Sequence, residues 1–136
     1  MIFLLNLLEP ITSMQILCMG FLAILFLQSG FDKVFDYQAN NQYMKEHFAK
    51  SPLKSTISIL FPLITLFEVL AGVCSLAGLL MFFLNETTEI GLIGAQLAAV
   101  NIIMLFFGQR LAKDYQGAVT LTQYFILTLM SIYILS

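Results

Sequence analysis

The stretch that decides the fold is residues 56–84, TISILFPLITLFEVLAGVCSLAGLLMFFL, in which Glu68 is the only charged residue. A bilayer core is about 30 Å thick, and a helix needs about 20 apolar residues to cross it. This stretch exceeds that length, so we expect it to span a membrane with some tilt or to protrude. Its apolar residues follow one another continuously, whereas barrel strands alternate with polar residues.

Three further segments are similarly apolar: residues 11–31, 90–109 and 117–135. The chain as a whole is 60% hydrophobic and 10% charged, against about 25% charged residues in soluble domains. The short links between the last three segments favour antiparallel neighbours. The sequence therefore predicts one all-α domain over 1–136, an integral membrane four-helix bundle with up-down antiparallel topology. Residues 1–8 lack the basic start of a signal peptide, and we interpret them as a retained lead-in.

The basic residues lie only in the loops after the first and the third predicted span. They are Lys33, Lys45, Lys50, Lys54, Arg110 and Lys113. Basic loops face the cytoplasm, so we predict a bacterial inner (cytoplasmic) membrane protein, multi-pass, with both termini on the non-cytoplasmic side. The net charge of −2 and the missing basic face argue against nucleic acid as a partner.

The longer loop 38–55 is predicted to contain a short interfacial amphipathic helix between helices 1 and 2. One face of this helix would carry Tyr43, Met44, His47 and Phe48, with Lys45 and Lys50 away from it. The alternative is a disordered polar loop. At its end, Ser51 and Pro52 are typical of a helix start, as N-cap and first helical residue.

Glu68 lies about 12 residues into its span, or ~18 Å along the helix, and hence near mid-membrane. An ionised carboxylate there must face the bundle interior, be neutral or have a partner. It is our candidate for a catalytic, proton-handling or ligand-binding group. The alternative is a protonated side chain that only forms a hydrogen bond across the bundle.

Further candidates for ligand or partner binding lie near the basic end of the bundle or in its helices. They are Gln28, Gly30, Asp32, Lys33, Gly72, Asn101, Arg110 and Asp114. Lys33 can extend to the interface beside Asp32 and Asp36, as a membrane anchor with local charge pairing. Alternatively, this cluster and the charged residues 110–114 form one charged mouth at the cytoplasmic face.

Polar and small residues in the spans predict helix packing. Gln96 and Asn101 are expected to make interhelical hydrogen bonds, worth roughly 0.6–2 kcal/mol each, with ligand contact as the alternative. Small residues recur at helical spacing in the second and third spans, which favours close packing of these two helices. They are Ala71, Ser75 and Gly78 in the second span, and Gly91, Ala95 and Ala99 in the third.

The sequence gives little indication of a metal site or of a disulfide bond. His47 is the only histidine, and no cysteine pair has zinc-ligand spacing, so we expect no metal. Cys18 and Cys74 lie at similar predicted depth. A disulfide between them requires a close approach of their Cα atoms, and two small apolar side chains are the alternative.

Several short motifs resemble those of the DoxX family. The segment 30–34, GFDKV, is similar to a G-x-x-K-[L/V] element at the end of the family's first helix, and 67–79, FEVLAGVCSLAGL, resembles its second-helix pattern. The segment 108–115, GQRLAKDY, is similar to the link between the third and fourth helices of some short members. The resemblance implies a small four-helix bacterial membrane protein and points to Gly30, Lys33, Glu68 and Gly72.

Members of that family include a subunit of a thiosulfate:quinone oxidoreductase and partners of redox-protection complexes. We therefore expect an accessory subunit of a larger, respiratory or redox membrane complex, without catalytic activity of its own. One alternative is a quinone-linked oxidoreductase component of the thiosulfate:quinone type that uses Glu68, and another is a small transporter. The expected partners are membrane lipid and other membrane subunits. No intrinsic cofactor is expected, and a quinone or a lipid is a possible ligand.

Overall fold

The computed structural model describes residues 6–136, and the predicted lead-in lies largely outside these described residues. Within this range the chain forms helices and no strands. The helices are α2 (Pro10–Phe35), α3 (Tyr37–His47), the 3-10 helix η1 (Lys54–Thr56), α4 (Ile57–Asn85), α5 (Glu89–Leu111) and α6 (Tyr115–Leu135). Four of them, namely α2, α4 with η1, α5 and α6, are long and apolar enough to cross a membrane. The all-helical fold with four apolar spans is thus confirmed.

The ends of the four long helices lie within four residues of the predicted span boundaries, whereas the separate prediction of a helix start at Ser51 fails. Pro10 is the first residue of α2, where its missing N–H costs no hydrogen bond. Ser51 and Pro52, however, do not begin a helix, and that prediction is wrong. The Ser51 hydroxyl accepts a hydrogen bond from the Leu53 backbone N–H at 3.1 Å, which holds a turn. The chain then passes through η1, and α4 begins at Ile57.

Small residues bring α4 and α5 into close contact, as their spacing predicted. A Cβ atom built on Gly78 would overlap the backbone of Gly91, and one on Gly94 would lie 2.7 Å from the Ser75 hydroxyl. Gly78 contacts Gly91, whereas Ser75, which precedes Gly78, contacts Gly94, which follows Gly91. The two helices therefore run in opposite directions. The side chains of Ala71, Ala95 and Ala98 complete this seam and are fully buried.

Two glycines from the DoxX-like motifs pack α2 against α4. A Cβ on Gly30 would approach the Val69 side chain to 2.8 Å, and one on Gly72 would approach Leu27 to 2.8 Å. Both glycines are therefore required for close helix approach, which explains their presence without any ligand.

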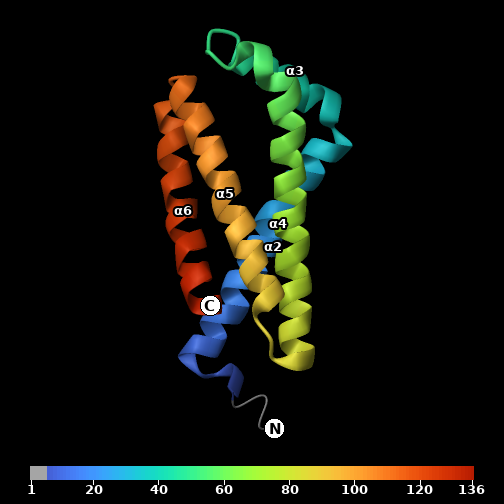
Figure 1. Ribbon diagram of the computed structural model, residues 1–136, viewed down its shortest axis with the longest axis vertical. Coiled ribbons are helices and arrows are strands. Elements are labelled where there is room, and N and C mark those ends of the chain that lie inside the picture. The colour runs from blue at the N-terminus through green and yellow to red at the C-terminus, as the bar shows by residue number, and fades with distance from the viewer. Residues whose placement is uncertain (1–5) are drawn as a thin grey trace.

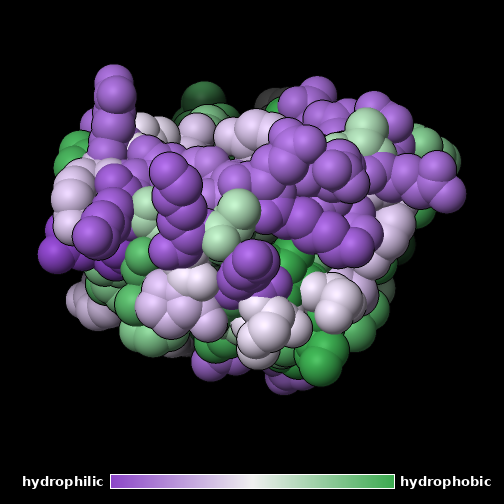
Figure 2. All heavy atoms as spheres, turned by 90° about the horizontal axis from the view of Figure 1, so that it is seen from above, coloured by the Kyte–Doolittle hydropathy of each residue, from purple (hydrophilic) through white to green (hydrophobic). Residues whose placement is uncertain are grey.

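The arrangement of the helices separates an apolar body from a hydrophilic end. In Figure 1, α4 and α5 lie close together near their connecting turn and diverge toward the end that carries α3. The start of α2 and the C-terminus lie at the opposite end. Figure 2 looks onto the α3 end, where hydrophilic residues gather, with apolar residues around the margin.

Candidate functional site

Glu68 forms an ion pair inside the helix bundle. Its side chain is 2% exposed, and its Oε2 atom lies 2.9 Å from the Lys33 Nζ of α2. The Ser29 hydroxyl donates a hydrogen bond to the same oxygen at 3.0 Å and accepts one from Lys33 Nζ at 2.8 Å. A carboxylate at this depth was expected to face the bundle interior, be neutral or have a partner. Glu68 is buried in the interior and has Lys33 as its partner. Sequence reasoning missed Ser29, although its i, i+4 spacing to Lys33 was a usable signal.

The side chain of Lys33 does not extend to the membrane interface as expected. It reaches to buried Glu68 and is only 20% exposed, whereas Asp32 and Asp36 are exposed. No ion pair joins Lys33 to either aspartate within residues 6–136. The expectation of local charge pairing at the interface is therefore wrong for Lys33, because a carboxylate in an apolar environment attracts the ammonium group more strongly than one in water.

A cavity of about 420 Å³ lies above this ion pair, between α3, α4 and α5. Its walls are mainly apolar, and Lys33 is the only Lys, Arg, Asp or Glu among the lining residues. These residues are Lys33, Asn40, Tyr43, Met44, His47, Phe48, Leu53, Ile57, Leu60, Phe61, Ile64, Met104, Leu105, Phe107, Gly108 and Gln109. A volume in this range fits a small organic ligand.

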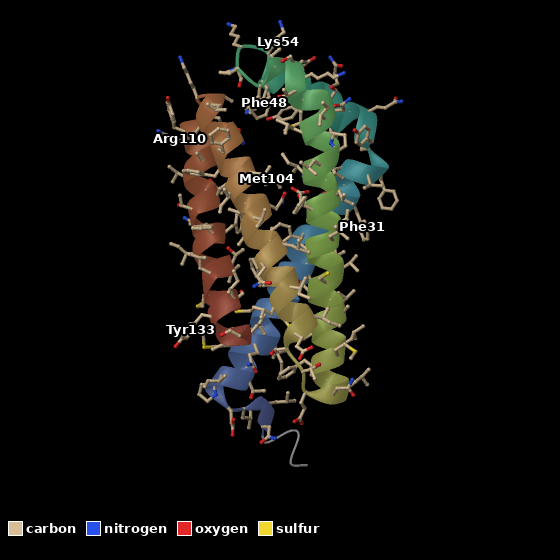
Figure 3. All side chains as sticks on the ribbon, in the orientation of Figure 1. Phe31, Phe48, Lys54, Met104, Arg110 and Tyr133 are labelled. Carbon is tan, nitrogen blue, oxygen red and sulfur yellow. The ribbon has the colours of Figure 1, made fainter. Side chains whose placement is uncertain are left out.

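The cavity follows from a change in side-chain size along α5. Near Gly91, Gly94 and Ala98 this helix touches α4 closely, whereas farther along it carries Met104 and Leu105. Large side chains keep the helices apart, so a space opens beyond the close contact. Figure 3 shows Phe48 near the upper end of the region between α4 and α5, with Met104 lower down.

Helix α3 and the residues after it cover the cavity. The face predicted to carry Tyr43, Met44, His47 and Phe48 does line this space. Phe48 is 4% exposed and packs with Ile57 and Phe61 in a small separate core. The helix is therefore held against α4 by apolar contacts as well as by its connection to α2.

His47 links α3 to the far side of the cavity. Its Nε2 atom lies 3.0 Å from the Gln109 Oε1 atom of α5 and 3.5 Å from the Asp114 Oδ2 atom. Asp114 also caps α6 by accepting a hydrogen bond from the Gly117 N–H at 3.0 Å. Asp114, a candidate named from the sequence, thus contacts His47. Sequence reasoning had placed His47 on one face of the short helix but had not predicted this contact.

Asn101 and Gln96 do not make the interhelical hydrogen bonds expected of them. Gln96 is exposed on the outer face of α5, whereas the side chain of Asn101 is fully buried. Neither the Nδ2 nor the Oδ1 atom of Asn101 has a hydrogen-bond partner in the described chain. The prediction is wrong for both residues, because Gln96 is exposed and no group of the described chain forms a hydrogen bond with the buried Asn101 amide.

The remaining candidate residues lie outside the cavity. Gln28 and Asp32 are exposed, while Gly30 and Gly72 pack against neighbouring helices. Arg110 lies 4.7 Å from the centre of the Tyr115 ring, a cation–π contact at the outer edge of the bundle. Of the candidates named from the sequence, the structure therefore brings together Lys33 and Glu68 directly.

The cysteines and acidic groups offer little additional chemistry. Cys18 and Cys74 are both free thiols, which agrees with the interpretation as small apolar side chains. Over residues 6–136, no three His, Cys, Asp or Glu side chains are grouped so that they could hold a metal ion.

No family model, curated protein or solved structure matched this chain in comparisons with known proteins. The resemblance to the DoxX family therefore stays a prediction.

Proposed function

We propose that the protein is a DoxX-like component of the bacterial inner membrane that binds a quinone-class molecule in the cavity between α3, α4 and α5. In this proposal the four apolar helices cross the bilayer in an up-down antiparallel bundle, and α3 lies at the cytoplasmic interface. Both termini lie on the non-cytoplasmic side. Support comes from the positions of the six basic residues, which lie either between the last turn of α2 and the start of α4 or between the last turn of α5 and the start of α6.

The observation that carries the proposal is an apolar cavity with a single ammonium group at its deep end. Lys33 Nζ has three N–H donors, of which two are used by Ser29 and Glu68. The third is free to donate a hydrogen bond to a carbonyl oxygen of a ligand. Aromatic and aliphatic walls with a few polar side chains, among them the Lys33 ammonium group, suit a flat ring that carries carbonyl groups.

The cavity also provides a route of entry for such a ligand. Phe107 lines the cavity and is nevertheless 60% exposed on the surface of α5. The cavity therefore reaches the molecular surface at an apolar side chain of a membrane-spanning helix. A membrane-soluble molecule would enter there directly from the lipid.

Glu68 is the residue that we propose exchanges a proton with the bound quinone. Its Oε2 atom is held by Ser29 and Lys33, whereas Oε1 accepts no hydrogen bond from the described chain. In a thiosulfate:quinone type of reaction, the electrons would come from a partner subunit. The quinone would take up two electrons from that subunit and two protons, and this chain would contribute the binding cavity and Glu68 as a group that passes protons to the quinone.

Filling the cavity tests the binding proposal. The Ile64→Trp variant places a large ring in the buried wall and should weaken binding of decylubiquinone on the order of tenfold or more, because the ring occupies the ligand volume. The measurement is a titration of purified protein in lipid nanodiscs. Leu66→Trp is the matched control, since Leu66 lies on the same helix but is 53% exposed.

Two results of this titration would contradict quinone binding in the cavity. The first is that the unmodified protein does not bind decylubiquinone. The second is that Ile64→Trp and Leu66→Trp bind it equally well, which would place the binding elsewhere. Thermal unfolding of both variants shows whether a loss of binding reflects a loss of fold.

A second candidate function is that of an accessory subunit without activity of its own. It is favoured by how little of the described chain lies outside the long helices, namely α3, η1 and short connections. We expect extraction in a mild detergent to yield the chain within a larger membrane complex, identified by mass spectrometry of the copurified subunits. Isolation as a lone monomer at native expression would contradict this function. The small transporter stays a prediction that no observation favours.

A further inference from the structure

Asn101 and Glu68 lie at the same level of the bundle on facing helices. The contacts of Gly78 with Gly91, and of Ser75 with Gly94, give the register of α4 against α5. Two helical turns are about seven residues, so one further step of that length from Ser75 and Gly94 pairs Glu68 with Asn101. Both side chains are buried, at 2% and 0% exposure.

Both residues also lie directly beneath the cavity. Asn101 precedes the lining residues Met104 and Leu105 by three and four positions, and Glu68 follows the lining residue Ile64 by four. Residues at these spacings share one helix face. Glu68 and Asn101 thus lie about one helical turn below the residues that form the floor of the cavity, namely Ile64 of α4 and Met104 and Leu105 of α5.

In the described part of the chain, the amide of Asn101 has two unpaired polar atoms, whereas the Ser75 hydroxyl, which is also buried and unpaired, lies about two helical turns farther from the cavity. The donor and the acceptor of the Asn101 amide are both buried and both without a hydrogen-bond partner in residues 6–136. A buried polar group in this state is destabilising, and a leucine of similar size would avoid the cost. Such a group is expected where a ligand supplies the missing partners.

We propose that Asn101 is the specificity-determining residue of the cavity and contacts the polar edge of the quinone ring, an inference that rests on the proposed function. Nδ2 donates a hydrogen bond to the carbonyl of the oxidised form. Oδ1 accepts one from the hydroxyl of the reduced form, so a single amide serves both redox states. Met104 lines the cavity about one turn from Asn101, and its unbranched, flexible side chain moves aside to admit the ring.

The test compares decylubiquinone, its reduced quinol and n-decane as a tail without polar groups, each titrated into protein in nanodiscs. The unmodified protein should bind the quinone and the quinol with similar affinity, and decane much more weakly. Asn101→Leu should bind both ring compounds about tenfold more weakly, the value of roughly one lost hydrogen bond. Its affinity for decane should not fall. Gln96→Leu, which removes an exposed amide from the same helix, is the matched control and should change nothing.

The thermal unfolding temperature separates a binding role from a structural one. Asn101→Leu without ligand should unfold at a higher temperature than the unmodified protein, because an unpaired buried amide is removed. Equal binding by Asn101→Leu and the unmodified protein would overturn the role of Asn101 while leaving quinone binding intact. A lower unfolding temperature would also overturn it, since Asn101 would then have a partner within the protein. No quinone binding by the unmodified protein would instead contradict the proposed function.

Discussion

Replacing either partner of the Lys33–Glu68 ion pair is expected to lower the free energy of unfolding by about 3–5 kcal/mol, because the remaining charge is left in an apolar interior. Lys33→Met should cost more than Glu68→Leu. Glu68 is 2% exposed and has a short side chain, so it cannot reach water when its partner is gone. Lys33 is 20% exposed, and its long aliphatic stem allows the ammonium group to move toward the interface.

The double variant Lys33→Met with Glu68→Leu provides the decisive comparison. With both charges removed, the interior contains two apolar side chains, and stability should recover to well above that of either single variant. The measurement is unfolding by sodium dodecyl sulfate in mixed micelles, applied to all four proteins. Lys54→Met, at an exposed position of η1, controls for the loss of a positive charge. Additive losses in the double variant would show that the two side chains do not interact.

The spans and the close contact between α4 and α5 could be predicted because the signals are local in the sequence. Hydropathy over about 20 residues identifies a spanning helix wherever its neighbours lie. Small residues spaced four apart, such as Gly91, Ala95 and Ala99, likewise indicate a contact face on a single helix. The cavity had a local signal too, since α5 changes from Ala98 to the larger Met104 and Leu105 within two turns.

The ion pair and the unpaired amide could not be predicted, since they depend on how separate helices are rotated against one another. Lys33 and Glu68 were each named as candidates, but the sequence does not indicate which way either side chain points about its helix. Lys33 was expected at the interface because only its own helix was considered. Asn101 was expected to have a partner for the same reason, whereas no group of the described chain forms a hydrogen bond with its amide.

Gly78→Ala tests the contact on which the whole arrangement of α4 and α5 depends. The added Cβ would overlap the backbone of Gly91, which cannot rotate away as a side chain would. We expect a loss of about 1–3 kcal/mol in the free energy of unfolding, as for other overpacked interiors, and a larger loss for Gly78→Leu.

Gly20→Ala is the matched control for this substitution, because a Cβ at Gly20 of α2 would meet no atom within 4 Å. An alanine in a helix is favoured over glycine by roughly 0.5–1 kcal/mol, so Gly20→Ala should raise stability while Gly78→Ala lowers it. Unfolding in mixed micelles measures both. If both variants gain stability, α4 and α5 do not meet at Gly78 and Gly91. The register that pairs Glu68 with Asn101 would then be lost, and with it the polar floor of the cavity.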